Sequence, residues 1–233
     1  MTNTVKPRVV VMNMTARSGK DTAVHHLLKI YNEAKHLTYK EKLIEATINF
    51  FRVSRERWDT RYDLSANMPG GVTTWIKDVP WEGVLEVGDK TYSQRTALIH
   101  VSENVMKPVF GKQVFGDAVA NHLEEGGLYL VSDSGFDEEL IPVLAKADVL
   151  VLKRDRLNSN WVGDSRGWVT KELGGKHVWV PGGIQDEADY LTFVTDAVGD
   201  WLGSLDKQRE IDEVISDLAK VWATPIYHEE DEE

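Results

Sequence analysis

A short polar turn near the start of the chain carries residues that could bind phosphate. Val9-Val10-Val11-Met12 is followed, five residues later, by Arg17-Ser18-Gly19-Lys20-Asp21-Thr22. Gly19 would let the backbone approach a phosphate closely, and a helix beginning here would present unpaired N–H groups and the positive end of its dipole. Lys20 could reach the outer phosphates, while Asp21 and Thr22 offer oxygen ligands for Mg²⁺, with Thr22 favoured as the direct one. The turn therefore predicts a site for a nucleotide triphosphate.

The turn departs from a complete phosphate-binding loop, which reads G-x-x-x-x-G-K-[ST] between a strand and a helix. Met14 stands at the position of the first glycine, and Asp21 at that of the Ser or Thr. A purely structural interpretation stays open, in which Ser18 or Asp21 caps a helix and Gly19 relieves a tight turn.

Strands and helices that would hold this turn alternate along the chain. Apolar runs typical of strands buried on both faces lie at 9–12, 128–133, 148–154 and 176–183. Apolar residues at helical spacing indicate helices within 24–31, 41–54, 94–107, 109–123, 191–202 and 211–222. This alternation predicts an α/β fold with a mainly parallel central sheet. Together with the phosphate-binding turn it suggests a three-layer fold of the P-loop NTPase type, in a single domain over residues 1–225.

Three segments stand apart from this alternation. Residues 63–92 are predicted to form an insertion with a β-hairpin turning at Gly88-Asp89. Residues 153–170 follow the third strand and contain Arg154, Arg156 and Arg166, which suits a lid-like loop closing over phosphates. Residues 226–233 read as a disordered acidic tail, because like charges repel and little can be buried.

Composition narrows the classes of function. The formal net charge is −11, so binding of duplex DNA is not expected. The chain has no cysteine, which excludes disulfides and thiolate chemistry. No apolar signal segment or membrane span is evident, and we expect a cytoplasmic protein that acts on small-molecule nucleotides, alone or as a homodimer.

The string "RSGKDT" at 17–22 resembles the phosphate loop of bacteriophage deoxynucleoside monophosphate kinases, and also that of phosphomevalonate kinases. Later segments are similar to the phage family in the same order, over residues 8–156. They are "HLTYKEKLIEA" at 36–46, "YSQRTALIHVSENV" at 92–105, "VFGKQVFGDAVANHL" at 109–123 and "YLVSDSGFDEEL" at 129–140. The resemblance implies a kinase that uses ATP and Mg²⁺ in the cytoplasm of an infected bacterium.

The resemblance and the strand positions together suggest roles for residues beyond the loop. Asp133 ends an apolar strand, where ligands collect in α/β sheets, and could orient Mg²⁺ or hold the acceptor; alternatively it caps its own turn. Arg95 could clamp the phosphate of the acceptor or simply face solvent. Arg154 would serve catalysis, and Arg156 and Arg166 would contact ATP. Gly135 stands where the family usually has an arginine, so Arg95 or an arginine of the lid-like loop must compensate.

The leading hypothesis is transfer of the γ-phosphoryl group of ATP to a deoxynucleoside monophosphate. Two alternatives stay open. One is a kinase of the same fold that acts on another acceptor, such as a hydroxymethylated base in phage DNA. The other is a non-catalytic nucleotide-binding or interaction protein, which the departures at Met14 and Gly135 favour.

Overall fold

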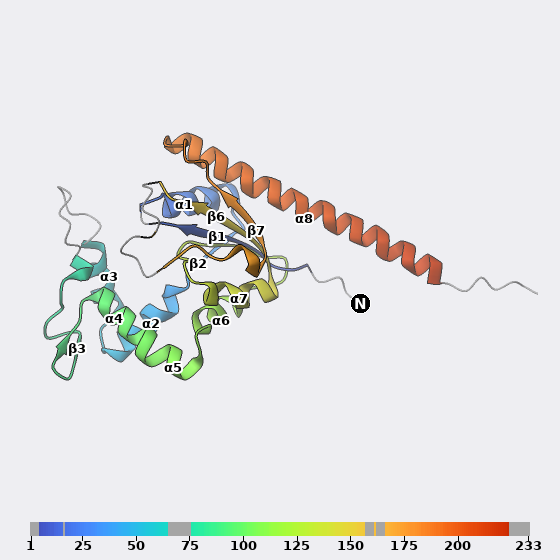
Figure 1. Cartoon of the computed structure of the whole chain (residues 1–233). Helices are drawn as coiled ribbons and strands as arrows, with labels where there is room; N and C mark the ends of the chain where they lie inside the picture. Colours follow the sequence, from blue (N-terminus) through green and yellow to red (C-terminus); the bar gives the residue numbers. More distant parts are fainter. Residues whose placement is uncertain (1–4, 16, 65–75, 157–160, 162–165, 224–233) are drawn as a thin grey trace, which may run out of the picture.

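The computed structural model describes residues 5–15, 17–64, 76–156, 161 and 166–223 (Figure 1). Residues 65–75 of the predicted insertion, 157–160 and 162–165 of the predicted lid-like loop, and the predicted acidic tail lie outside the described residues.

A five-stranded parallel sheet forms the centre of the molecule, and β1 is its middle strand. In spatial order the strands are β2 (Lys35–Leu37), β5 (Leu128–Val131), β1 (Arg8–Met14), β6 (Asp148–Arg154) and β7 (Lys176–Trp179). The predicted α/β fold with a parallel sheet is thereby confirmed. β5, β6 and β7 lie within the predicted runs, and β1 extends past both ends of its predicted run at 9–12. The edge strand β2 was not predicted, because its three residues are too few and too polar to give an apolar run.

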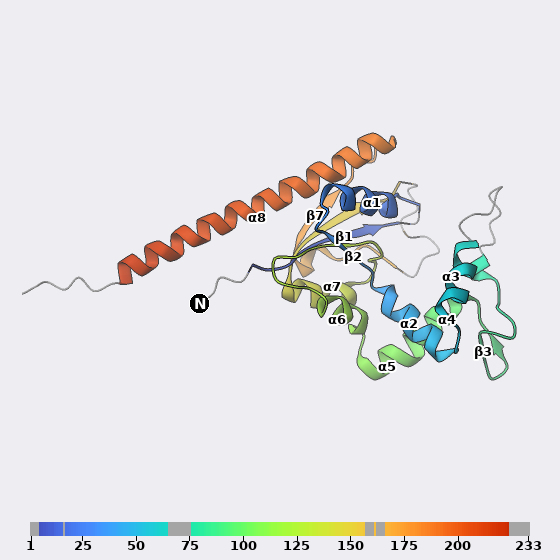
Figure 2. The same ribbon diagram turned by 180° about the vertical axis from the view of Figure 1, so that it is seen from behind.

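Helices cover both faces of this sheet (Figures 1 and 2). α1 (Lys20–Ile30) and α8 (Glu187–Ala223) pack on one face, and α6 (Val114–Ala120) and α7 (Asp137–Lys146) pack on the other. Successive residues of β1 point to opposite faces, so Val10, Met12 and Met14 enter the first core while Val9 and Val11 enter the second. The middle strand is therefore fixed by two hydrophobic cores.

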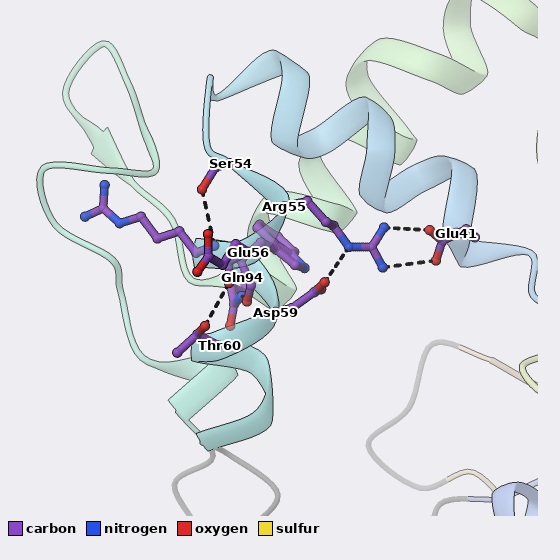
Figure 3. Close-up of polar contacts among 9 residues, drawn as sticks. Glu41, Ser54, Arg55, Glu56, Asp59, Thr60 and Gln94 are labelled. Atoms are coloured by element: carbon purple, nitrogen blue, oxygen red, sulfur yellow. Dashed lines mark hydrogen bonds and ion pairs between the residues drawn. The ribbon is translucent and has the colours of Figure 1, made fainter.

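A smaller helical region extends from one end of the sheet. It contains α2 (Lys40–Phe50), α3 (Arg55–Leu64), the short helix η1 (Ile76–Asp78), the hairpin of β3 (Glu86–Val87) and β4 (Lys90–Thr91), and α4 (Gln94–Val101). The predicted hairpin is confirmed, and Gly88 in its turn has a φ of 58°. Trp58 is fully buried in a third core, and Gln94 Nε2 donates to its carbonyl oxygen at 2.8 Å. Arg55 ties α3 to α2 through Glu41 and also contacts Asp59 (Figure 3).

Two helix predictions were wrong in their extent. The predicted helix 94–107 is interrupted, since π-helical Ser102–Met106 separates α4 from α5 (Lys107–Phe110). The predicted helices 191–202 and 211–222 are one continuous helix, α8, because no proline or paired glycine stands between them to end it. Its C-terminal half extends past the sheet (Figures 1 and 2). There Ile211, Val214, Ile215 and Leu218 are 53–60% exposed.

Among the described residues, no helix combines the length and apolar character needed to cross a membrane.

Gly116 on α6 lies against the backbone of α7. A Cβ atom at Gly116 would overlap the backbone carbonyl of Glu139, whose carbon would be only 2.9 Å away. Because backbone cannot yield as a side chain does, Gly116→Ala is expected to lower the free energy of unfolding by about 1–3 kcal/mol. Gly203→Ala on α8 is the control, since nothing lies within 4 Å of its Cβ position. Urea denaturation would measure both variants, and equal stability of Gly116→Ala and wild type would contradict the packing argument.

Candidate functional site

The loop after β1 is stabilised by the side chains of its own residues. Gly19 has a φ of 85° and precedes the first residue of α1, a conformation that side chains rarely tolerate. Beneath it, the buried hydroxyls of Thr15 and Ser18 lie 2.7 Å apart. The Oγ atom of Ser18 also accepts a hydrogen bond from the Arg156 backbone N–H at 3.2 Å. These contacts hold the loop against the chain that leaves β6.

Arg154 at the end of β6 contacts the loop through a hydrogen bond to its backbone. Its Nη1 donates to the Ser18 carbonyl at 3.0 Å, and its Nη2 donates to the Ile184 carbonyl at 2.9 Å. The guanidinium also stacks 3.7 Å above the ring of Tyr190, whose hydroxyl lies 3.2 Å from the Gly19 carbonyl. In this structure Arg154 positions the loop, and the catalytic role predicted for it stays a prediction.

A pocket of about 280 Å³ opens at the N-terminus of α1. It is lined by Arg17, Gly19, Lys20, Asp21, Thr22, Arg154, Arg156, Gln185, Glu187 and Tyr190. Seven of these ten residues were predicted to belong to the site. The other three come from the start of α8 and the turn before it, for which the sequence offered no signal beyond a helical pattern. Pockets that enclose a whole drug-sized ligand are typically about 300–1,000 Å³, so this one suits a part such as a polyphosphate.

The pocket is positively charged although the chain as a whole is acidic. Four cationic side chains and two carboxylates line it. The N-cap residue of α1 is Gly19, which has no side chain to cap the helix. Backbone N–H groups at a helix start need an acceptor, and together with the helix dipole they favour an anion. The arrangement is therefore suited to a phosphate group.

Lys20 is the first residue of α1, and the charges of four other residues act on its ammonium group. Burial lowers the pKa of its ammonium from the ordinary value; Asp21 and Asp133 raise it, and Arg166 and Lys40 lower it further. The sequence predicted Lys20 together with Asp21, Asp133 and Arg166. The structure brings these residues close enough for their charges to act on one another.

Asp133 joins β5 to the helical region. Its Oδ1 accepts the Tyr39 N–H at 2.8 Å, and its Oδ2 accepts the Lys40 N–H at 2.9 Å. The carboxylate thus holds the start of α2 rather than its own turn. Burial raises its pKa, and the two backbone hydrogen bonds oppose this shift. The predicted role of Asp133 in binding Mg²⁺ stays a prediction.

Arg95 and Met14 lie apart from the pocket. Arg95 on α4 is exposed and forms an ion pair with Asp78, and it does not line the pocket. Met14 is fully buried, with its Sδ atom 3.3 Å from the Tyr190 hydroxyl. The side chain that replaces the first glycine of the motif therefore enters the core on the α1 face and leaves the pocket open.

The residues suited to Mg²⁺ are few. Among the described residues, no three His, Cys, Asp or Glu side chains gather as a metal site. Asp21 and Thr22 both line the pocket beside Lys20. Two protein oxygens suit Mg²⁺, which in nucleotide sites takes most of its ligands from phosphates and water.

Glu139 on α7 is predicted to make the free energy of unfolding depend on pH. Burial, with a contribution from the Asp133 charge, raises the pKa of Glu139 from 4.5 to about 8. Between these values the folded protein keeps a proton that the unfolded chain has lost, so the free energy of unfolding falls as pH rises. Glu139→Gln, which cannot ionise, is expected to flatten this slope and to be more stable than wild type at pH 8 by about 1–3 kcal/mol.

Urea denaturation from pH 5 to pH 8 would measure this slope. Glu33→Gln, at an exposed position, is the control and should follow wild type. A Glu139→Gln variant with the wild-type slope would contradict the assignment.

The fold and the pocket define an α/β protein whose five-stranded parallel sheet is compatible with a P-loop fold. No protein-family model matches the chain, and no curated protein matches it.

Proposed function

We propose that the protein is a kinase that transfers the γ-phosphoryl group of ATP to a deoxynucleoside monophosphate and yields a diphosphate. The proposed setting is the cytoplasm of a bacterium infected by a phage. The observation that carries the proposal is the cationic pocket at the N-terminus of α1, which Lys20 lines and where the N-cap residue is the glycine Gly19. A site of this kind, on a loop after the middle strand of a parallel sheet, suits the phosphates of a nucleotide.

In the proposed reaction an oxygen of the acceptor phosphate attacks the γ-phosphorus of ATP, and the bond to the β-phosphate oxygen breaks. Such a transfer asks the protein for alignment and for positive charge around the moving group. Lys20 and the first N–H groups of α1 would hold the β- and γ-phosphates. Arg156 and Arg17 line the same pocket and would neutralise the remaining oxygens.

Mg²⁺ would be held by Thr22, with Asp21 contacting it directly or through water, and would neutralise charge on the β- and γ-phosphates. The hydroxyl of Thr22 and the carboxylate of Asp21 are both exposed at the pocket, which makes them accessible to such an ion. Asp133 is a further candidate, through its position beside Lys20.

Two structural details answer the objections that the departures at Met14 and Gly135 raise against a catalytic protein. Met14, which replaces a glycine of the motif, is turned into the core by its contact with Tyr190. Gly135, which replaces an arginine of the family, is covered by the side chain of Arg166. Neither departure therefore removes the positive charge or the open space that phosphoryl transfer requires.

The test is a coupled assay of ADP formation with Mg²⁺-ATP and each of the four deoxynucleoside monophosphates in turn. We expect turnover with at least one acceptor and only slow hydrolysis of ATP without any. Intact ATP binding beside no turnover for all four would reject the kinase and leave a nucleotide-binding protein.

A further inference from the structure

The side chain of Arg166 occupies the space beside Gly135. A Cβ atom at Gly135 would lie 2.5, 2.6 and 2.7 Å from Cβ, Cγ and Cδ of Arg166. A side chain at position 135 and the stem of Arg166 therefore exclude each other. Gly135 follows β5 by four residues and Asp133 by two, so the stem of Arg166 packs against the segment that leaves this strand, 31 positions earlier in the sequence. The guanidinium carbon of Arg166 lies 5.1 Å from the centre of the Trp161 ring.

The backbone on the C-terminal side of Arg166 is fixed to the same edge of the sheet. The Gly167 N–H donates to the Gly135 carbonyl at 2.8 Å. Asn13, a fully buried residue of β1, donates through Nδ2 to the Gly167 carbonyl at 3.0 Å, and its Oδ1 accepts the Val169 N–H at 2.9 Å. Asn13 lies two residues before the loop that follows β1. The same strand therefore anchors both this loop and the backbone next to Arg166.

Arg166 acts electrostatically on Lys20 without lining the pocket at the start of α1. Its charge also acts on Asp133 and Glu139. Lys40, at the start of α2, acts on Lys20 and Asp133 from the helical region. Arg166 and Lys40 therefore act both on Lys20 and on the Asp133 carboxylate. In this group of described residues the three cations Lys20, Lys40 and Arg166 outnumber the two carboxylates Asp21 and Asp133, which suits a second anion.

We propose that Arg166 binds the phosphate monoester of the acceptor, in the place that a longer side chain at position 135 would otherwise fill, and not the phosphates of ATP. The inference rests on the proposed function for the identity of the acceptor. A planar guanidinium can bind two phosphate oxygens at once, and from this position it would direct the third toward the γ-phosphate held at Lys20. Lys40 would add a second positive charge from α2.

The experiment measures two affinities by isothermal titration calorimetry, one for each deoxynucleoside monophosphate and one for Mg²⁺-ATP. Because hydrogen bonds to charged groups contribute about 1.5–3 kcal/mol, Arg166→Ala is expected to weaken monophosphate binding by about 10–100-fold. Its affinity for ATP should change less than about twofold. Arg166→Lys keeps the charge without the fork and should fall between Arg166→Ala and wild type. Arg209→Ala, on the surface of α8, is the matched control.

Exchanging the side chains at positions 135 and 166 tests whether the two occupy the same space. Gly135→Arg alone should bind the monophosphate poorly, because the new side chain collides with Arg166. Gly135→Arg combined with Arg166→Gly should recover most of the wild-type affinity. Thermal melting of every variant would identify any that has failed to fold, and Arg166→Lys then decides the question.

The outcomes separate this inference from the proposed function. Equal monophosphate affinity of Arg166→Ala and wild type, or loss of ATP affinity instead, would overturn the role of Arg166. Failure of wild type to bind any of the four monophosphates would overturn it as well. Monophosphate binding that depends on Arg166 but leads to no turnover would uphold the phosphate site and reject the kinase.

Discussion

Lys20→Ala is expected to lower kcat/KM for phosphoryl transfer by about 10²–10³-fold, the range found when a charge-stabilising donor is removed from an enzyme site. Lys20 lines the pocket at the start of α1, and the charge of Asp133 acts on it. Without it, the charge that develops on the transferred group meets no positive charge at the centre of the site. Lys20→Arg should not restore activity, because the planar guanidinium is broader than the ammonium that the loop encloses.

The fold should survive this change. Burial lowers the pKa of Lys20, which means that its environment partly disfavours the charged form, so removing it is expected to alter the free energy of unfolding by less than about 1 kcal/mol. Lys29→Ala, at an exposed position in the last turn of the same helix, is the control for helix content. Steady-state kinetics with thermal melting would measure both. A Lys20→Ala variant with wild-type kcat/KM would falsify the phosphate-binding role of the loop.

Asp133→Asn is expected to lower kcat/KM for the acceptor by about 10²-fold and the free energy of unfolding by about 1–2 kcal/mol. The carboxylate accepts one backbone N–H from Tyr39 and one from Lys40, one on each oxygen. An amide has a single oxygen, so its NH₂ group would face one of these donors. The start of α2 would then lose a hydrogen bond, and Lys40 would no longer be held beside Lys20.

The dependence on Mg²⁺ separates the two roles considered for Asp133. A carboxylate that only holds α2 would leave the Mg²⁺ concentration for half-maximal rate unchanged in Asp133→Asn. If the carboxylate also orients the ion, the Asp133→Asn substitution would raise the Mg²⁺ concentration needed for half-maximal rate. Asp117→Asn, exposed on α6, is the control for loss of a carboxylate. Wild-type kinetics and stability of Asp133→Asn would contradict both roles.

The sequence was informative where the determinants are local. The apolar run of β1, the glycine before α1 and the turn at Gly88 are read within a few residues, and each is present in the structure. α7 was not predicted as a helix, since Pro142 lies within it and weakens a helical reading. β2 was too short to show a pattern.

The contacts that complete the site are distant in sequence, and no period or motif reveals them. Asp133 reaches α2 across 94 positions, and Arg154 reaches the Ser18 carbonyl across 136. The sequence left open whether Arg95 or an arginine of the lid-like loop compensates for Gly135, and the packing of Arg166 against Gly135 is the basis for proposing Arg166. Arg95, the other alternative, forms its ion pair with Asp78 instead.

The hydroxyl of Tyr190 beside the Gly19 carbonyl joins positions 171 residues apart. During synthesis, which proceeds at about 5–20 residues per second, Gly19 leaves the ribosome early. Tyr190 leaves it only when most of the chain has been made. Until then the loop lacks its contact with Tyr190, and the growing chain cannot complete the pocket at the start of α1. Nucleotide would therefore stabilise the finished protein against unfolding while leaving nascent chains that end before Tyr190 unaffected.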